Sequence, residues 1–186
     1  MNQHCVDPRK ERAESLACQL ASDTRGATII EFAVVAAPLI ALIIAILQTS
    51  IVFFSQQTLE SAAEQASRLI LTNQAQKTAM SLSAFKQQAC KALPPYMKCA
   101  NLIVDVRTAA SFAAADTSMP TLHYDASGNV DNSWSYQLAG SEKITTMRLM
   151  YPLPVVSAPL GFNLSNMGGS KRLLIATAVF QPEPLS

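Results

Sequence analysis

The sequence has few charged residues, and one long segment has almost none. Charged residues make up 15% of the 186 residues and hydrophobic residues 49%, and the net charge is +1. Between Arg25 and Glu60 the one ionisable side chain is that of Glu31. No basic stripe interleaved with aromatic residues is present, so nucleic acid is not an expected partner.

Histidine is also scarce, which limits the chemistry that the chain offers. It has two histidines, His4 and His123. His123 is close to Asp125 and serines are common, so a Ser-His-Asp arrangement is formally available, but no nucleophile-elbow motif or metal-ligand spacing supports it. Asp125, Asn129 and Asp131 lack the spacing of an EF-hand, and a solvated hairpin turn explains them better. We expect no catalytic residue, metal or cofactor.

The uncharged segment is long enough to cross a membrane. Ile29 to Phe54 is a run of Ala, Ile, Leu, Val and Phe with few polar interruptions. As a helix its roughly 26 residues would cover about 39 Å, more than a hydrocarbon core of about 30 Å. The alternative, a buried core helix, would need a larger protein around it. We therefore assign residues 27–54 to a transmembrane helix that contacts membrane lipid.

The flanking charges predict the orientation of this helix. Four basic residues precede it and one lies close behind it: Arg9, Lys10, Arg12 and Arg25 before, Arg68 after. Cationic flanks stay in the cytoplasm, so residues 1–26 are expected inside and the segment after Phe54 outside. The apolar run is too long for an ordinary secretory signal, and no small-x-small cleavage site follows it.

The junction between leader and helix is distinctive. Gly26 precedes the helix directly, and Glu31 and Phe32 follow within two turns. One interpretation is local: Thr28 and Glu31 fit a helix capping box, with Gly26 as a flexible joint. The other is that the segment resembles the processing site of type IVb prepilins and pseudopilins, which have a glycine, four residues, then glutamate and an aromatic residue.

This second interpretation implies a processing event and an assembly role. The resemblance implies that a prepilin peptidase cleaves between Gly26 and Ala27, making Ala27 the mature N-terminus. It also implies that Glu31 of an incoming subunit pairs with the terminal amine of a neighbour in the pilus. Pro38 removes a helix hydrogen bond and is expected to kink or loosen the helix. A glutamate-aromatic-alanine opening followed by this proline resembles the TadE-like family, minor pseudopilins of tight-adherence (Flp) pilus systems.

Behind the membrane the helix is expected to continue as an amphipathic stalk, residues 55–80, with helical periodicity to about Gln76. Apolar residues recur there at helical spacing: Leu59, Ala62, Ala63, Ala66, Leu69 and Ile70. We interpret this stripe mainly as packing against the protein's own domain. Glu64 and Arg68 form an i,i+4 pair on the solvated side.

Residues 81–186 are predicted to form a periplasmic α+β domain, so that the whole chain has a pilin-like plan. A short helix capped by Ser83 is expected to run to Leu93 and to end before Pro94-Pro95. About three antiparallel strands should follow: Leu102–Arg107, Ile144–Tyr151 ended by prolines, and Leu173–Phe180. The last is apolar on both faces, which favours a central place in the sheet. Between the first two strands lies a polar loop, Ala109 to Tyr136.

The resemblance to the TadE-like family extends from about Arg25 to the C-terminus. It includes the Arg68-Leu69-Ile70 step, Phe85 with Cys90, the Tyr151-Pro152-x-Pro154 step and the closing segment from Val179 to Pro184. Thr72-Asn73 stands where members of the family tend to have a glycine.

The four cysteines separate by expected compartment. Cys5 and Cys18 lie in the leader, where cytoplasmic reductants keep thiols free, whereas Cys90 and Cys99 lie outside, where disulfides persist. We predict a Cys90–Cys99 disulfide around the Pro94-Pro95 turn. Two buried free thiols are the alternative.

Together these features predict a non-enzymatic minor pseudopilin of a tight-adherence pilus, anchored in the bacterial inner membrane by a single pass. The expected partners are the prepilin peptidase, other minor pseudopilins, the major pilin and the inner-membrane pilus platform. A domain this large is difficult to accommodate at every position of a thin fibre, which favours a role in priming assembly and a place at the tip, supporting adhesion. The alternative is an uncleaved, membrane-tethered periplasmic adaptor of a secretion or pilus machine.

Overall fold

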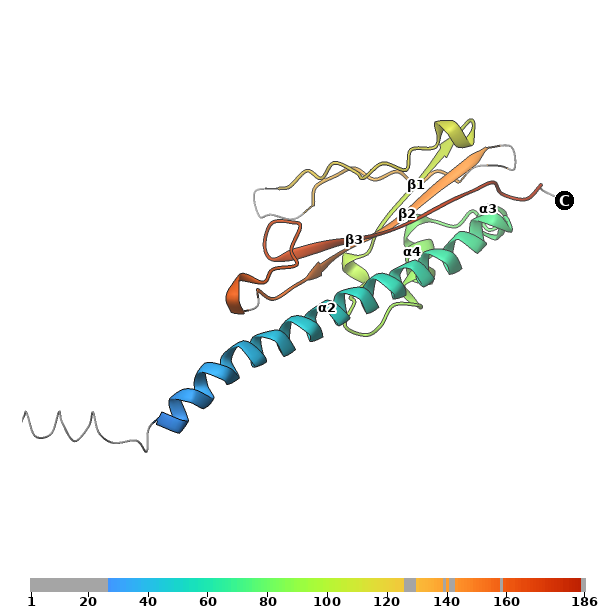
Figure 1. Cartoon of the computed structure of the whole chain (residues 1–186). Coiled ribbons are helices and arrows are strands. Elements are labelled where there is room, and N and C mark those ends of the chain that lie inside the picture. Colours follow the sequence, from blue (N-terminus) through green and yellow to red (C-terminus); the bar gives the residue numbers. More distant parts are fainter. Residues whose placement is uncertain (1–26, 126–129, 139, 141–142, 158, 185–186) are drawn as a thin grey trace, which may run out of the picture. The chain divides into compact units, whose positions relative to one another are not determined.

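The computed structural model of the chain describes residues 27–125, 130–138, 140, 143–157 and 159–184. These residues fall into two compact units, one ending at Ile44 and the other covering Ala45–Ser186. The second unit contains a sheet, short helices and the C-terminal part of a long helix, α2 (Ala27–Leu71). Figure 1 shows the order of these elements, and the fold is α+β, as the sequence predicts.

The stalk part of α2 packs against one face of the sheet through the predicted apolar stripe. Five of the six stripe residues are buried in the main core: Leu59, Ala62, Ala63, Ala66 and Ile70. Leu69 packs at the edge of this core. The small side chains of the three alanines let the helix pack closely on the sheet. Because these residues are buried in the domain's own core, the stripe contributes to the folding of the domain.

The helix ends earlier than expected, at Leu71 instead of near Gln76. Asn73 adopts a left-handed backbone conformation, φ 56° and ψ 16°, which breaks the helix before a single further turn, α3 (Gln74–Lys77). Glycine adopts the left-handed conformation most readily, and asparagine comes next. Asn73 can therefore take the conformation for which members of the TadE-like family tend to have a glycine. The C-terminal tail covers this break: Asn73 Nδ2 donates to Glu183 O at 2.6 Å, and Glu183 N donates to Leu71 O at 2.9 Å.

The predicted short helix forms as α4 (Leu82–Cys90), and its N-cap lies two residues before the expected one. Its cap is Ser81, whose side chain accepts a hydrogen bond from Ala84 N, so the prediction of Ser83 as the cap is wrong. Both serines fit the local signal, and the tertiary burial of Phe85 selects the register. A disulfide-closed turn and a short 3-10 helix, η2 (Cys99–Asn101), then lead into the sheet.

Three antiparallel strands form the sheet in the order β1-β2-β3. They are β1 (Ile103–Ala109), β2 (Ile144–Pro154) and β3 (Lys171–Phe180). The prediction that the last strand is central is wrong: β2 is central and β3 lies at an edge. The face of β3 that contains Leu174 and Ala176 packs in the core with α2, and Gln56 Nε2 donates to Ile175 O at 3.0 Å. The other face of β3 has apolar side chains that are partly exposed, so an apolar pattern on both faces did not require a central strand.

The central strand also continues past the expected stop at Pro152 and ends at Pro154. Strand β1 pairs with β2 only as far as Met150. Beyond that point β2 has one neighbour, β3, so prolines can be accommodated in what is locally an edge strand.

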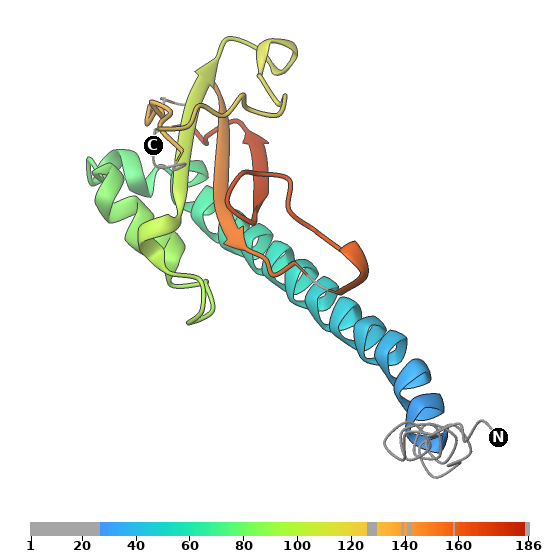
Figure 2. The ribbon, with the colours of Figure 1, turned by 90° about the vertical axis from the view of Figure 1, so that its left-hand side faces the viewer.

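The loop between β1 and β2 lies over the sheet face opposite α2, as Figure 2 shows in yellow and light orange. It contains the 3-10 helix η3 (Phe112–Ala114) and an antiparallel bridge between Tyr124 and Val130. The bridge flanks the predicted turn, whose residues 126–129 lie outside the described part of the chain. Near its end the loop pairs with β1, because Val106 N donates to Ser135 O at 2.7 Å and Gln137 N donates to Val106 O at 3.0 Å. The loop is therefore anchored to the sheet.

Candidate assembly and membrane site

The predicted processing junction is only partly described by the structure. Ala27 is the first described residue of α2, and Gly26 lies outside the described residues. Ala27 and Thr28 are both helical in the structure. A capping residue stands outside the helix that it caps, so the capping-box interpretation with Thr28 as the cap is not supported, and the peptidase site stays a prediction.

Glu31 and Phe32 lie on the first turns of α2, and both are exposed. Among the residues that the structure describes, Glu31 takes part in no ion pair. Around it the helix surface is apolar, with Ile29, Ile30 and Phe32 between 66% and 74% exposed. A carboxylate in such surroundings is costly in a membrane without a partner, so a partner is expected from another chain or from the terminal amine.

From Ile29 onward α2 is long and apolar enough to cross a membrane. Within the apolar run, large side chains from Val34 to Phe54 are mostly exposed, which suits contact with lipid or with other apolar helices. Pro38 lies inside α2 without ending it, and whether it bends the helix stays a prediction.

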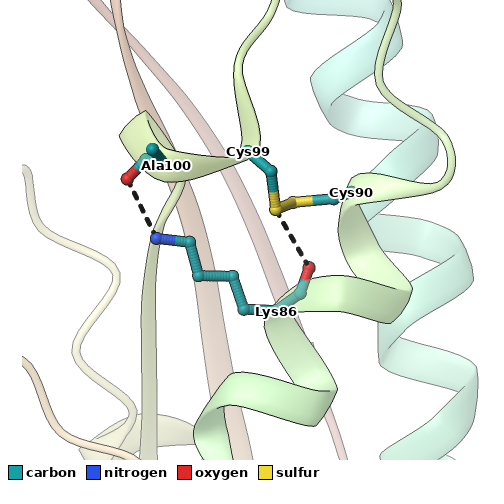
Figure 3. The surroundings of a disulfide bond; sticks show 4 residues. All are labelled: Lys86, Cys90, Cys99 and Ala100. Atoms are coloured by element: carbon teal, nitrogen blue, oxygen red, sulfur yellow. Dashed lines mark hydrogen bonds between the residues drawn. A yellow bond between two sulfur atoms is a disulfide. The ribbon is translucent and has the colours of Figure 1, made fainter.

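The predicted disulfide between Cys90 and Cys99 is confirmed. It joins the end of α4 to η2, with the two Cα atoms 5.5 Å apart (Figure 3). Lys86 Nζ donates to Ala100 O at 3.0 Å, a second link between the same elements. Cys99 Sγ lies 4.0 Å from Lys86 O, a contact without a proton because a disulfide sulfur carries none. Burial lowers the pKa of Lys86 below its ordinary value.

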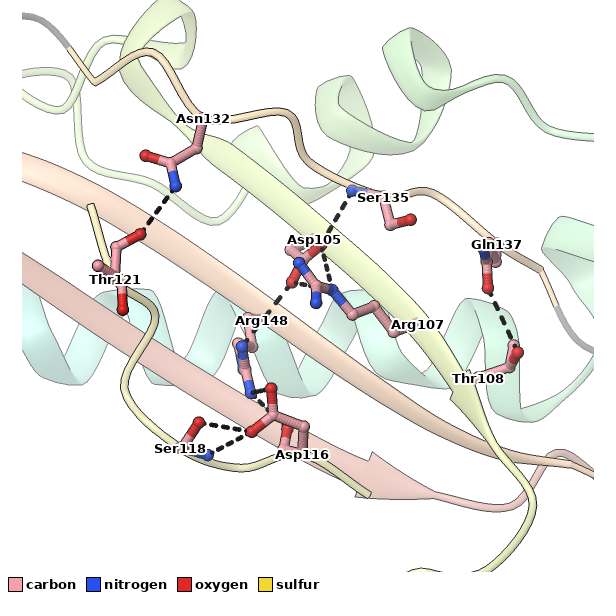
Figure 4. A network of polar contacts seen from close by, with 10 residues as sticks. All are labelled: Asp105, Arg107, Thr108, Asp116, Ser118, Thr121, Asn132, Ser135, Gln137 and Arg148. Carbon is pink, nitrogen blue, oxygen red and sulfur yellow. Dashed lines mark hydrogen bonds and ion pairs between the residues drawn. The ribbon is translucent and has the colours of Figure 1, made fainter. Parts of the chain in front are cut away.

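A buried polar network that the sequence analysis missed lies on the sheet face opposite α2 (Figure 4). Asp105 and Arg148 face each other across β1 and β2, with side chains 1% and 3% exposed and Arg148 Nη1 3.9 Å from Asp105 Oδ2. Arg107 Nε lies 3.0 Å from the same carboxylate oxygen, and Ser135 N donates to Asp105 Oδ1 at 3.0 Å. The alternation of apolar residues on β1 places Asp105 on this face, but pairing with Arg148 requires the register between strands.

Arg148 also holds the loop. Its Nη2 lies 3.3 Å from Asp116 Oδ2 and donates to the Asp116 carbonyl oxygen. The side-chain hydroxyl and backbone N–H of Ser118, then Arg148, lower the pKa of Asp116 to about 2. This carboxyl therefore keeps its charge, and its ion pair with Arg148, to a lower pH than an ordinary aspartate would.

The other sequence candidates lie in the β1–β2 loop, and one of them, Asn129, is outside the described residues. His123 belongs to the paired part of the loop: its N–H donates to Asn132 Oδ1 at 2.8 Å and its carbonyl accepts from Asp131 N at 2.9 Å. Within the described ranges, no cluster of three His, Cys, Asp or Glu residues could hold a metal ion.

The described elements define a class: a long apolar helix that carries a small α+β domain with an antiparallel sheet. The family is indicated by comparison, since the family model described as TadE-like protein matches residues 26–68. This match confirms the resemblance over the junction, the apolar run and the stalk as far as Arg68. Neither curated proteins nor solved structures give a match to this chain.

Proposed function

We propose that this chain is a minor pseudopilin that helps to assemble a tight-adherence pilus and acts without enzymatic chemistry. The observation that carries the proposal is that the TadE-like match covers residues 26–68, which include the predicted junction and most of the apolar helix α2. The predicted cleavage point between Gly26 and Ala27 lies at the start of this match. The helix crosses the inner membrane once, with the leader in the cytoplasm and the domain in the periplasm.

Cleavage after Gly26 creates the group that Glu31 needs. It leaves an amine at Ala27, a cation at the start of the same exposed apolar surface. In an α-helix residues four apart are separated by about 6 Å along the axis, so a small axial shift brings Glu31 of one subunit level with the amine of the next. Pairing in trans neutralises both charges in lipid and sets the axial register between subunits.

The domain suits an end of the fibre. The second unit contains a three-stranded sheet, short helices and a loop anchored over the sheet face away from α2, so it is bulkier than a helix alone. At the tip no subunit lies above it. We therefore place it at low copy number, priming assembly with other minor pseudopilins at the inner-membrane platform and remaining at the tip, where it supports adhesion.

The first experiment tests processing. Full-length protein from native membranes is expected to begin at Ala27 by mass, and Gly26→Leu should retain the 26-residue leader because a bulky side chain blocks close approach of the peptidase to the backbone. Gly140→Leu is the matched control, because a Cβ at Gly140 meets no atom within 4 Å. Wild-type protein that still begins at Met1 in cells with the peptidase would favour the uncleaved adaptor.

The second experiment tests pairing by Glu31. Glu31→Gln should be cleaved normally but produce far fewer pili, because a neutral amide cannot compensate the amine. The control is Glu60→Gln, an exposed glutamate on the same helix beyond the apolar run. Pili are counted by electron microscopy and processing is read by immunoblot. Full piliation of Glu31→Gln would refute the pairing role.

The third experiment tests priming. Deleting the chain should sharply reduce pili while the major pilin is still made and processed. Quantitative immunoblots of sheared pili should find this subunit far below the major pilin. Normal pilus numbers in the deletion strain, or amounts equal to those of the major pilin along the shaft, would contradict the proposal.

A further inference from the structure

Two loops of the domain reach back onto the part of α2 that belongs to the apolar run. The first is the disulfide-closed turn, where Tyr96 Oη lies 3.0 Å from Ser55 Oγ, one residue after the run ends at Phe54. The second joins β2 to β3, and its Val156 carbonyl accepts a hydrogen bond from Gln48 Nε2. Figure 2 shows the two loops, in light green and dark orange, reaching down on the two sides of α2. Both contacts lie within the second unit, so they are internal to the domain.

The positions of these contacts along α2 indicate how deep in the membrane the two loops would lie. Gln48 lies six residues before Phe54, which corresponds to about 9 Å along a helix axis. This is within the range of about 5–10 Å to which interfacial segments bury their apolar faces in a membrane. If Phe54 marks the outer limit of the span, the β2–β3 loop reaches into the outer leaflet, and the Tyr96 turn lies at its surface.

The composition of the loops fits this depth. From Leu149 to Ser170 the chain has no Asp, Glu, Lys or Arg, and Val156 within this segment is 74% exposed. Tyr96 is 49% exposed and lines an apolar groove of about 530 Å³ with Leu47, Ile51 and Phe54 of the helix. Exposed Lys98 stands two residues after Tyr96. An apolar surface edged by tyrosine and lysine is typical of a membrane–water interface.

Several polar groups at this level have hydrogen-bond partners, although Gln48 Oε1 has none among the described residues. An irregular backbone in lipid leaves carbonyls without water, and Gln48, a polar interruption of the apolar run, supplies a donor to Val156. Thr49 and Ser50 donate to carbonyls of their own helix, Ala45 O and Ile46 O, both at 2.8 Å. These hydroxyls therefore need no water either.

We propose that this end of the domain, formed by the turn at Tyr96 and the β2–β3 loop at Val156, is a membrane-docking surface that inserts into the outer leaflet of the bilayer that α2 spans. The occupant is lipid, because the surface is continuous with the apolar run and has the exposed lysine Lys98 where headgroups begin. The docking holds the domain upright on the membrane before a subunit is extracted into a pilus. It rests on the proposed membrane span of α2.

The test uses tryptophan as a depth probe, since the chain has one tryptophan, Trp134. Full-length Val156→Trp and Tyr96→Trp are reconstituted in vesicles of phosphatidylcholine and phosphatidylglycerol, with bromine near either end of the acyl chains. The signal of Trp134, measured in the wild type, is subtracted. Val156 is exposed and needs no repacking, so its variant is independent of any packing change at Tyr96.

The expected result is that both probes lose most of their emission in lipids brominated near the headgroup and are protected from aqueous acrylamide. Two exposed positions calibrate the assay: Phe53→Trp, 71% exposed in the apolar run, and Met119→Trp, 77% exposed in the β1–β2 loop. Phe53→Trp should be quenched by brominated lipid, and Met119→Trp by acrylamide alone.

Three other outcomes overturn the inference for different reasons. If both probes behave like Met119→Trp while Phe53→Trp is quenched by lipid, the span stands and the docking surface is refuted. If both are protected from lipid bromine and from acrylamide, a second copy of the chain covers the surface instead. If Phe53→Trp itself escapes the brominated lipid, the proposed membrane span has failed.

Discussion

The buried pair Asp105–Arg148 allows a sharp test of what holds the outer face of the sheet together. We consider Asp105→Val, Arg148→Met and the double variant. Removing one partner of a buried ion pair costs about 3–5 kcal/mol, because the other charge is left without compensation. In Asp105→Val the guanidinium of Arg148, which is 3% exposed, still has its ion pair with Asp116. We therefore expect the free energy of unfolding to fall by about 3 kcal/mol, the lower limit of this range.

The reverse variant should cost less. In Arg148→Met the carboxylate of Asp105 keeps Arg107 Nε at 3.0 Å and Ser135 N at 3.0 Å, so it is not left alone. We expect about 1.5–2 kcal/mol, the lower part of the range for the loss of a hydrogen bond to a charged group. The double variant replaces the pair by apolar side chains and should cost less than the sum of the single variants by at least about 1.5 kcal/mol.

Urea denaturation of the full chain in detergent measures these differences. Trp134 is the one tryptophan and stands next to Ser135, whose N–H the carboxylate of Asp105 binds, so its fluorescence reports on this region. Midpoints convert to free energies of unfolding through the urea dependence of each variant. If the losses in free energy of unfolding add in the double variant, or are equal in the two single variants, the pairing of Asp105 with Arg148 across β1 and β2 is refuted.

Three further predictions address other elements. Replacing Cys90 and Cys99 by serine should lower the free energy of unfolding by about 2.5–3 kcal/mol, the chain-entropy cost of a loop of about ten residues, measured by the same urea titration; no loss would contradict it. The side-chain carboxyl of Asp116 should titrate by NMR with a pKa of about 2, below its ordinary 3.8. Its contribution to stability should be complete above about pH 4 and disappear as the pH falls towards 2. A midpoint near 4 would show that the link to Ser118 and Arg148 is not formed. Asn73→Ala should be about 1 kcal/mol less stable than Asn73→Gly, because both lose the bond to Glu183 but only alanine strains the left-handed backbone; equal midpoints would argue against that conformation.

Much of the local structure could be predicted from the sequence. The apolar run from Ile29 to Phe54 and the stripe that begins at Leu59 are periodic patterns, and a helix satisfies its backbone within itself. The Cys90–Cys99 pairing followed from compartment and spacing. The three strands were located to within a few residues because alternation and proline are local signals.

The tertiary structure decided how these pieces combine. Strand order depends on how the whole domain packs, and β3 lies at the edge of the sheet although its sequence is apolar on both faces. The partner of Asp105 depends on register, which places Arg148 opposite it from a distant part of the chain. The contacts of Tyr96 with Ser55 and of Val156 with Gln48 likewise join segments far apart in sequence. Local patterns contain no information on such pairings, because they arise only when packing of the whole domain selects one arrangement.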